Sequence, residues 1–269
     1  MDNNGSLRMS SLLENLSLAA ANARKLFRNA IHPIYGTTNQ GRPDHIGSSV
    51  GIVYKNQRCL LTAAHIIDEA EKTDLHIGKR ELIGITQSFQ ITPKHKGRRE
   101  GDHYDFAISK VTEDLAMRMG EGAFLSEDHL AEDEPAHAYA FVGYPNSKNK
   151  KIDHQSRRVT PVLCMYTGTP SVSELILKKH NISGNDHIMV KHDGKKGIDS
   201  EGKRINTFGI RGMSGGAAIS LGQLAKPERL FSDQVPAPKL SGIIIEHHKR
   251  EKVLLATKLS TILNATVHS

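Results

Sequence analysis

The chain has 269 residues, of which 38% are hydrophobic and 24% are charged, and its formal net charge is +7. This length suffices for one large domain or two small ones with a buried core, and the composition excludes a disordered chain. No apolar run approaches the roughly 20 residues of a membrane span, and the N-terminus does not resemble a signal peptide, so we expect no membrane contact and a cytoplasmic protein.

The positive charge would favour nucleic acid only if it were organised into a binding surface. The Lys and Arg residues are scattered, with small clusters at 148–151 and 195–196, and no aromatic residues alternate with them. A surface that stacks bases needs such aromatic side chains. The sequence therefore disfavours nucleic acid as a partner.

An amphipathic helix is predicted near the N-terminus, where Ser11 and Glu14 have the spacing of a capping box. Apolar residues then recur at helical spacing until Pro33 ends the pattern. They are Leu12, Leu16, Ala19, Ala23, Leu26 and Ala30. We expect residues 1–36 to form a helical extension that packs on the main domain, or that binds an activating protein partner or a second copy.

Short strand patterns follow the helix. Residues 49–54 and 59–62 are apolar segments on either side of a polar turn at 55–58, which is typical of a β-hairpin. Further short β-type runs lie at 75–77, 82–85, 89–91 and 103–108. We assign residues 44–112 to a first β-barrel and the polar residues 113–134 to a linker.

A second group of strands fills the rest of the chain. Its apolar runs lie at 138–142, 159–166, 188–191, 217–220, 242–245 and 253–256. Two groups of short strands separated by a linker predict an all-β fold of two antiparallel six-stranded β-barrels, with an N-terminal α-helix. The second barrel would cover residues 135–265, within a main domain at 37–269.

Three short motifs carry candidate chemistry. Residues 212–216 (Gly-Met-Ser-Gly-Gly) place Ser214 in a tight turn, where a hydroxyl and backbone N–H groups can face one point, although this pattern also occurs in flexible loops. Residues 62–65 (Thr-Ala-Ala-His) end a predicted strand with His65. Asp105 enters the apolar strand Phe-Ala-Ile.

Together these motifs resemble those of chymotrypsin/trypsin-fold serine proteases, in that family's order of His, Asp and Ser. The resemblance covers residues 47–269 and is similar in style to bacterial trypsin-like peptidase domains, which lack the disulfides of digestive enzymes. It implies a serine endopeptidase that cleaves a protein or peptide substrate through an acyl-enzyme, without a cofactor. Ser214 would be the nucleophile, His65 the general base and Asp105 the residue that orients the histidine. The N–H groups of Gly212 and Ser214 would form the oxyanion hole.

Alternatives to these assignments stay open. His65 taken alone could be a core histidine, and Asp102 competes with Asp105, which we prefer because an apolar strand follows it. Met213 stands where digestive members of the family have an aspartate that pairs with a freshly cut N-terminus. This difference disfavours activation by that route, and it predicts a site that is either permanently formed or ordered by a partner or substrate.

By the same resemblance, a substrate pocket lies between residues 207–211 and 243–247, with Phe208 near its base. The candidate pocket residues are Phe208, Arg211, Ile245, Glu246 and His247. A slip of one residue along a strand reverses which side chains face the pocket, so no substrate preference is predicted.

No metal site is predicted. His187 and His192 are five residues apart and would face opposite sides of a strand, and the adjacent His247 and His248 also diverge. The two cysteines, Cys59 and Cys164, lie in apolar runs and are expected to be free thiols.

Two other functional classes remain possible from the sequence. One is a catalytically weak protein with the protease fold that binds peptides, and the other is a basic protein associated with nucleic acid. The presence of all three residue types of the triad argues against the first, and the scattered basic residues argue against the second.

Overall fold

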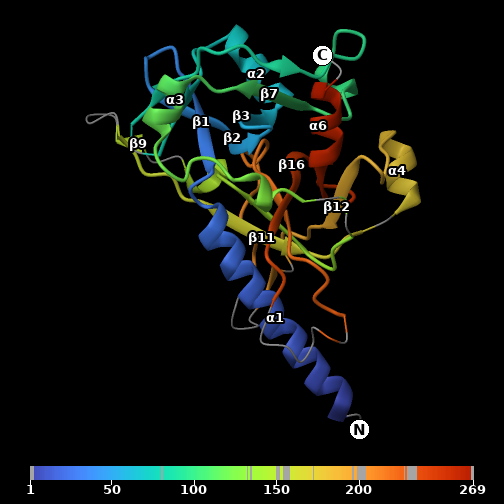
Figure 1. Ribbon diagram of the computed structural model, residues 1–269. Coiled ribbons are helices and arrows are strands. Elements are labelled where there is room, and N and C mark those ends of the chain that lie inside the picture. The colour runs from blue at the N-terminus through green and yellow to red at the C-terminus, as the bar shows by residue number, and fades with distance from the viewer. Residues whose placement is uncertain are drawn as a thin grey trace.

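The computed structural model describes residues 3–79, 81–131, 133, 135–149, 152–153, 158–171, 173–195, 197–198, 204–226, 228 and 235–267. The protein is mostly β-structure, arranged as two antiparallel sheets with a long helix at the N-terminus (Figure 1). Within the described ranges, no helix is both long and apolar enough to cross a membrane.

Helix α1 (Asn3–Phe27) confirms the predicted N-terminal helix. Ala19, Ala23 and Phe27 have no exposed surface and belong to the main apolar cluster, which also contains residues of both sheets. Toward its N-terminus the helix extends away from the sheets, and Leu13 and Leu18 are exposed (Figure 1). The C-terminal half of the apolar face therefore packs on the domain.

The first sheet has seven strands in the order β5-β4-β1-β2-β3-β7-β6. These strands are β1 (Ile31–Thr37), β2 (Pro43–Tyr54), β3 (Gln57–Ala63), β4 (His76–Ile77), β5 (Ile83–Gly84), β6 (Gln90–Ile91) and β7 (Phe106–Lys110). The predicted hairpin is confirmed as the β2–β3 pair, with a turn of only two residues. Lys55 and Asn56 have φ values of 49° and 59°, which is the backbone twist that a tight two-residue hairpin requires.

Strand β1 was not predicted, and it shortens the helical extension. The helix ends at Phe27, and residues 31–36 form a strand of the first sheet between β4 and β2. Pro33 ends the helical pattern as expected, yet it fits this strand because β4 pairs only with Ile34 and Tyr35. A proline without an N–H group is tolerated where no ladder bond is needed.

The second sheet has six strands in the order β11-β8-β15-β16-β17-β12. They are β8 (Tyr139–Gly143), β11 (Cys164–Gly168), β12 (His187–Lys191), β15 (Ala217–Ser220), β16 (Lys239–His248) and β17 (Val253–Lys258). Two separate two-stranded ladders are formed by β9 (Ile152–Asp153) with β10 (Arg158–Val159), and by β13 (Gly197–Ile198) with β14 (Arg204–Ile205). Cys59 on β3 and Cys164 on β11 are both free thiols.

The expectation of two closed six-stranded barrels is met only in part, because one sheet curls into a half-barrel and two closed barrels are not confirmed. Among the strands described here, no ladder joins the edge strands β5 and β6. In the second sheet the edges meet through a bridge between Pro170 and Val190 and a hydrogen bond of 2.8 Å from Ser171 N to Met189 O. Strands of two residues, such as β4, β5 and β6, provide too few backbone bonds for continuous closure.

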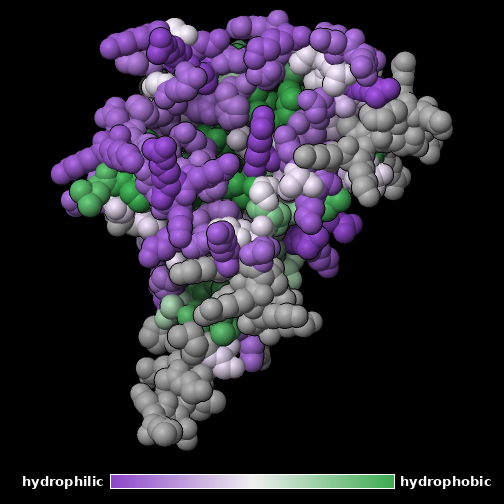
Figure 2. Space-filling model, turned by 180° about the vertical axis from the view of Figure 1, so that it is seen from behind, coloured by the Kyte–Doolittle hydropathy of each residue, from purple (hydrophilic) through white to green (hydrophobic). Residues whose placement is uncertain are grey.

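Short helices connect the strands: α2 (Ala64–Asp68), α3 (Glu113–Met119), α4 (Glu174–His180) and the C-terminal α6 (Leu259–Val267). Single 3₁₀ turns lie at Glu69–Glu71, Arg99–Gly101, Glu127–His129 and Asn146–Lys148. The predicted linker begins with α3, whose first turn is capped by Thr112, and then packs against β2 through Leu125. One continuous apolar cluster contains residues of both sheets, so the sheets are packed against each other. Seen from behind, the surface is covered mainly by hydrophilic residues, with small hydrophobic patches between them (Figure 2).

Candidate active site

His65 and Asp105 lie together because they flank two paired strands. His65 follows β3 and Asp105 precedes β7, and Ala63 of β3 pairs with Phe106 of β7. The Asp105 carboxylate contacts His65 twice: Oδ2 lies 2.6 Å from Nδ1, and Oδ1 accepts a hydrogen bond of 2.9 Å from the backbone N–H. These two bonds define both the position and the orientation of the imidazole ring.

Asp105 has a strained backbone, with φ at +41°. This conformation costs on the order of 1–3 kcal/mol for a residue with a side chain. The preceding carbonyls are held by the second sheet, since Tyr104 O accepts 2.5 Å from Thr257 Oγ1 and His103 O accepts 2.8 Å from His187 Nε2. The second sheet thus fixes the loop that presents the carboxylate to His65.

The electrostatic environment of His65 favours its protonated form. Burial lowers its pKa, but the hydrogen bond and the negative charge of Asp105 more than offset this, and the net pKa of His65 lies above the ordinary 6.5. An imidazolium at this position is therefore stabilised by its neighbour.

Asp102, the alternative to Asp105, also lines the cavity, but its carboxylate bonds to residues other than His65. Its carboxylate accepts hydrogen bonds from Thr92 and from Arg99, whose NH1 lies 2.6 Å away. The Arg99 guanidinium also binds Asp68 through Nε at 2.8 Å. Because Asp68 is the last residue of α2, Arg99 ties the helix that carries His65 to the loop that carries Asp105. Burial alone would raise the pKa of Asp68, but the bonds from Arg99 hold it below its ordinary value.

Ser214 lies in a tight turn before β15, and glycines are required on both sides of it. Gly212 and Gly215 have φ values of +94° and +81°. A Cβ at Gly215 would lie 2.0 Å from the Ser48 carbonyl oxygen, and one at Gly212 would lie 1.9 Å from Asn146 Oδ1. Only glycine fits these positions, which explains the Gly-x-Ser-Gly pattern in the sequence.

Ser48 on β2 joins this turn to the first sheet. Its N–H donates to Ser214 O at 2.8 Å, and its hydroxyl donates to Gly212 O at 3.0 Å while accepting from the Tyr144 N–H at 2.9 Å. Its own carbonyl accepts from Thr62 Oγ1 at 2.7 Å. Ser48 is fully buried, and two of its four hydrogen bonds hold the serine turn on the first sheet, while the other two fix Ser48 itself.

Met213 anchors the turn from the other side. It is 1% exposed and belongs to an apolar cluster of the second sheet with Ile210, Phe141 and Ile244. Packing in the core takes the place of the ion pair that an aspartate would make there. The turn therefore has its shape without a charged partner for residue 213.

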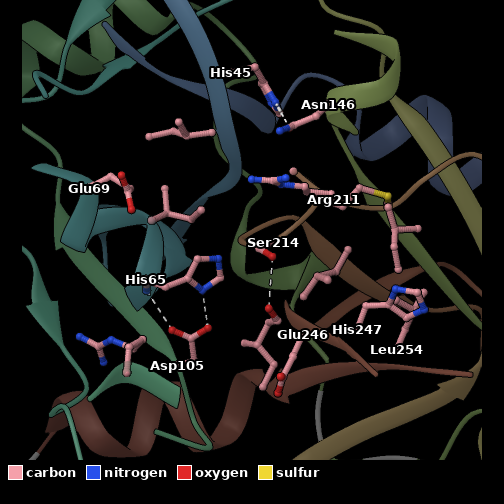
Figure 3. A pocket seen from close by; sticks show the side chains of 18 of the residues that line it. His45, His65, Glu69, Asp105, Asn146, Arg211, Ser214, Glu246, His247 and Leu254 are labelled. Carbon is pink, nitrogen blue, oxygen red and sulfur yellow. Dashed lines mark hydrogen bonds and ion pairs between the residues drawn. The ribbon is translucent and has the colours of Figure 1, made fainter. Parts of the chain in front are cut away.

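His65, Asp105 and Ser214 lie close together, and Figure 3 shows His65 between Asp105 and Ser214. The Ser214 hydroxyl donates to Ile245 O at 3.2 Å, a carbonyl freed from the β16–β17 ladder by a bulge. Within the described part of the chain, Ser214 makes no hydrogen bond to His65, and the N–H groups of Gly212 and Ser214 donate to no other residue. Both predicted oxyanion donors are thus available.

The three residues line a cavity of about 730 Å³ at the junction of the two sheets. Four of the five predicted pocket residues line it: Arg211, Ile245, Glu246 and His247. Phe208 does not, because it packs against the apolar cluster of the second sheet while Ile210 lines the cavity instead. Register along this irregular segment decides which side chain faces the cavity, and the sequence could not specify it.

His247 is neutral at neutral pH. Burial, together with the nearby His192 and Lys249, lowers its pKa to about 4. Its ring lies perpendicular to that of His192, with centroids 4.9 Å apart. This side of the cavity is therefore built from uncharged rings, whereas Glu246 beside it is exposed.

Sequence reasoning missed the residues that support the triad, namely Ser48, Arg99 and Asp68, and the pair of His45 and Asn146 near Gly212. His45 Nδ1 lies 2.7 Å from Asn146 Oδ1, and the two residues are 101 positions apart. The short polar segment Gly47-Ser48-Ser49 has no sequence feature that indicates a bond to residue 212. Contacts between distant segments carry no local signal.

No protein-family model and no curated protein matches the chain. The arrangement of two antiparallel sheets, one of them a half-barrel, is compatible with a trypsin-like fold. The case for a function therefore rests on the geometry of this site.

Proposed function

We propose that the protein is a trypsin-like serine endopeptidase. The observation that carries the proposal is the double contact of the Asp105 carboxylate with His65, with Ser214 beside that histidine in a cavity between two sheets. A core histidine bonded to backbone would not need an adjacent hydroxyl, open N–H donors and a cavity at one point.

The chemistry follows from the proton positions. The bond to Asp105 places the imidazole proton on Nδ1, which leaves Nε2 free to accept the proton of the Ser214 hydroxyl as that oxygen attacks a peptide carbonyl. The imidazolium is stabilised by Asp105 and then donates its proton to the leaving amine. Water, activated by the same histidine, hydrolyses the acyl-enzyme and regenerates Ser214.

The oxyanion would be bound by the N–H groups of Gly212 and Ser214. Losing one such donor typically costs about 3 kcal/mol of transition-state stabilisation. Ser48 acts here as a positioning residue, because its hydroxyl holds the Gly212 carbonyl at 3.0 Å and so fixes the 212–213 peptide group, which lies between the two peptide groups that carry the donors.

A peptide substrate has a backbone surface to bind. Strand β15 pairs with β16 only as far as Ile243. On the side of β16 that faces β15, the described ladders therefore leave residues 245–248 without a partner strand, and residues 245–247 line the cavity. An extended peptide can add to such an edge as a further strand. A peptide bound as such a strand would have its scissile carbonyl near Ser214.

A second candidate is a peptide-binding protein with little or no catalysis. It is favoured by one observation, the hydrogen bond of the Ser214 hydroxyl to Ile245 O in place of His65. Catalysis requires this hydroxyl to rotate toward Nε2, and a protein in which it cannot do so would bind peptides without cleaving them.

Labelling with a fluorophosphonate probe tests the proposal. The wild-type protein should be labelled, whereas Ser214→Ala and His65→Ala should not, and peptide hydrolysis should fall by on the order of 10⁶-fold in each variant. Ser49→Ala, which alters a buried serine outside the cavity, is the control and should be labelled like the wild type. A wild type that is neither labelled nor active, yet binds peptides from a library, would establish the second candidate instead.

A further inference from the structure

Two histidines and a glutamate converge outside the cavity, at the end of the strand that forms its wall. His180 is the last residue of α4, His248 is the last residue of β16, and Glu251 lies in the turn to β17. Their ligating atoms all lie within 4.8 Å of one another. The two imidazole rings are 3.7 Å apart between centroids and inclined by 34°.

Both Nε2 atoms in this cluster are buried, and neither makes a hydrogen bond of good geometry. Each faces a carboxylate instead: His248 Nε2 faces Glu246, and His180 Nε2 faces Glu251. Most buried polar atoms in proteins have a well-formed hydrogen bond. A cation between the rings would satisfy both nitrogens and both carboxylates.

The spacing of the cluster suits a tetrahedral ion. Ligands at about 2.0–2.1 Å from Zn²⁺ are separated from each other by roughly 3.4 Å in a tetrahedron. His180 Nε2 lies 3.7 Å from Glu251 Oε1, and His248 Nε2 lies 3.2 Å from Glu246 Oε2. These two separations are within about 0.3 Å of the tetrahedral value, and the ligand atoms of His180, His248 and Glu251 all lie within 4.8 Å of one another, so side-chain rotation can bring the groups around one ion.

We propose that His180, His248 and Glu251 bind a divalent transition-metal ion, with Zn²⁺ as the best fit and Glu246 as the fourth ligand. Imidazole and carboxylate groups are common zinc ligands, and two carboxylates neutralise the charge of the ion. No local pattern indicates this site, because His180 and His248 are 68 positions apart in the sequence.

Lys179 is the competitor of the metal. Its ammonium group forms an ion pair with Glu251 Oε1, which is a proposed ligand atom. The Lys179 side chain is 59% exposed and can turn into solvent. Metal binding thus exchanges an exposed ion pair, which contributes little to stability, for coordination bonds.

The site is also coupled in space to the cavity. Glu246 lines the cavity and lies one strand repeat before His248, on the same side of β16. A metal that binds both residues would draw the Glu246 carboxylate away from the cavity and tie β16 to α4. Binding of the ion is nevertheless independent of whether Ser214 is catalytic.

Titration of the full-length, chelator-treated protein with Zn²⁺ in a calorimeter and with Co²⁺ in a spectrophotometer tests the site. We expect one ion per chain and the intense visible absorption of tetrahedral Co²⁺. His180→Gln and His248→Gln should each weaken binding by more than about 100-fold, beyond what loss of a supporting residue costs. His95→Gln, at an exposed histidine elsewhere, should leave binding unchanged.

Lys179→Met provides the reciprocal test, because it removes the competitor without touching a proposed ligand. It should tighten Zn²⁺ binding and increase the rise in melting temperature that Zn²⁺ causes. Absence of binding in the wild type would overturn the proposal. So would binding that survives both histidine substitutions, or a Lys179→Met protein that binds no more tightly than the wild type.

Discussion

The two sheets hold their parts of the site by different means. In the first sheet, charged side chains bind one another: Asp105 holds His65, and Arg99 joins Asp68 to Asp102. In the second, the serine turn is held by glycine backbone geometry, by the packing of Met213 and by the hydrogen bonds of Ser48, without an ion pair.

This difference fits what the proposed mechanism requires of each part. A histidine that cycles between neutral and charged forms needs a nearby negative charge in a fixed position. A nucleophilic hydroxyl and two N–H donors need only an exact backbone shape, which packing and glycine provide. Substitutions that change charge should therefore have their main effect around His65 and Asp105. Substitutions that remove packing or hydrogen bonds should have their main effect on the turn that carries Ser214.

The largest effect is expected for Asp105→Asn. The Asn oxygen would keep its bond to the His65 N–H, so its NH₂ group would face Nδ1 and force the proton onto Nε2. With the wrong tautomer, kcat should fall on the order of 10⁴-fold while the fold is retained. Steady-state kinetics and circular dichroism check this. Asp102→Asn is the matched control, and a similar loss of kcat there would refute the assignment of Asp105.

Arg99→Met should mainly reduce stability. It leaves the Asp68 and Asp102 carboxylates without their shared cation, and the Asp102 side chain is only 4% exposed. We expect a loss of about 2–3 kcal/mol in the free energy of unfolding, less than a fully buried pair because Asp68 is partly in water. Urea denaturation measures it. Arg98→Met, at the exposed neighbour, should change the stability by less than about 0.5 kcal/mol.

Ser48→Ala should reduce stability less than Arg99→Met does, and it should also disturb the turn that carries Ser214. It leaves Gly212 O and the Tyr144 N–H unpaired, which costs on the order of 1–3 kcal/mol in stability. The kcat should fall more than KM rises, because the oxyanion donors lose their support. Ser49→Ala removes only one long bond of 3.4 Å to His32 O and should leave kcat unchanged. Equal kinetics in the two variants would contradict a positioning role for Ser48.

The smallest expected effect is a shift in the pH profile. Catalysis requires neutral His65, whose pKa is raised above 6.5 in the folded protein by Asp105. Activity should therefore fall as the pH decreases through a midpoint above 6.5, and in Asp105→Asn this midpoint should move to lower pH. A profile of kcat/KM against pH measures both. A wild-type midpoint below 6.5 would show that Asp105 does not stabilise the imidazolium.

Much of the fold could be predicted from local patterns. The N-terminal helix, the β2–β3 hairpin and the two groups of strands follow from hydrophobic periodicity and turn residues. Strand β1 escaped prediction because the helix was expected to continue through Ala30 to Pro33, whereas it ends at Phe27. The closure of both barrels was expected and is not confirmed, since periodicity specifies neither the length of a ladder nor the pairing of edge strands.

The sequence by itself determined the three candidate catalytic residues, because the Thr-Ala-Ala-His, Asp-Phe-Ala-Ile and Gly-Met-Ser-Gly-Gly motifs are continuous in the chain and reflect local backbone requirements. Only the tertiary structure decided what supports them and what faces the cavity: the Arg99 clamp, the hydroxyl of Ser48, and Ile210 in place of Phe208. These depend on contacts between segments up to 164 positions apart, as for Ser48 and Gly212. Such contacts are made by the packing of the whole chain, so no short segment records them.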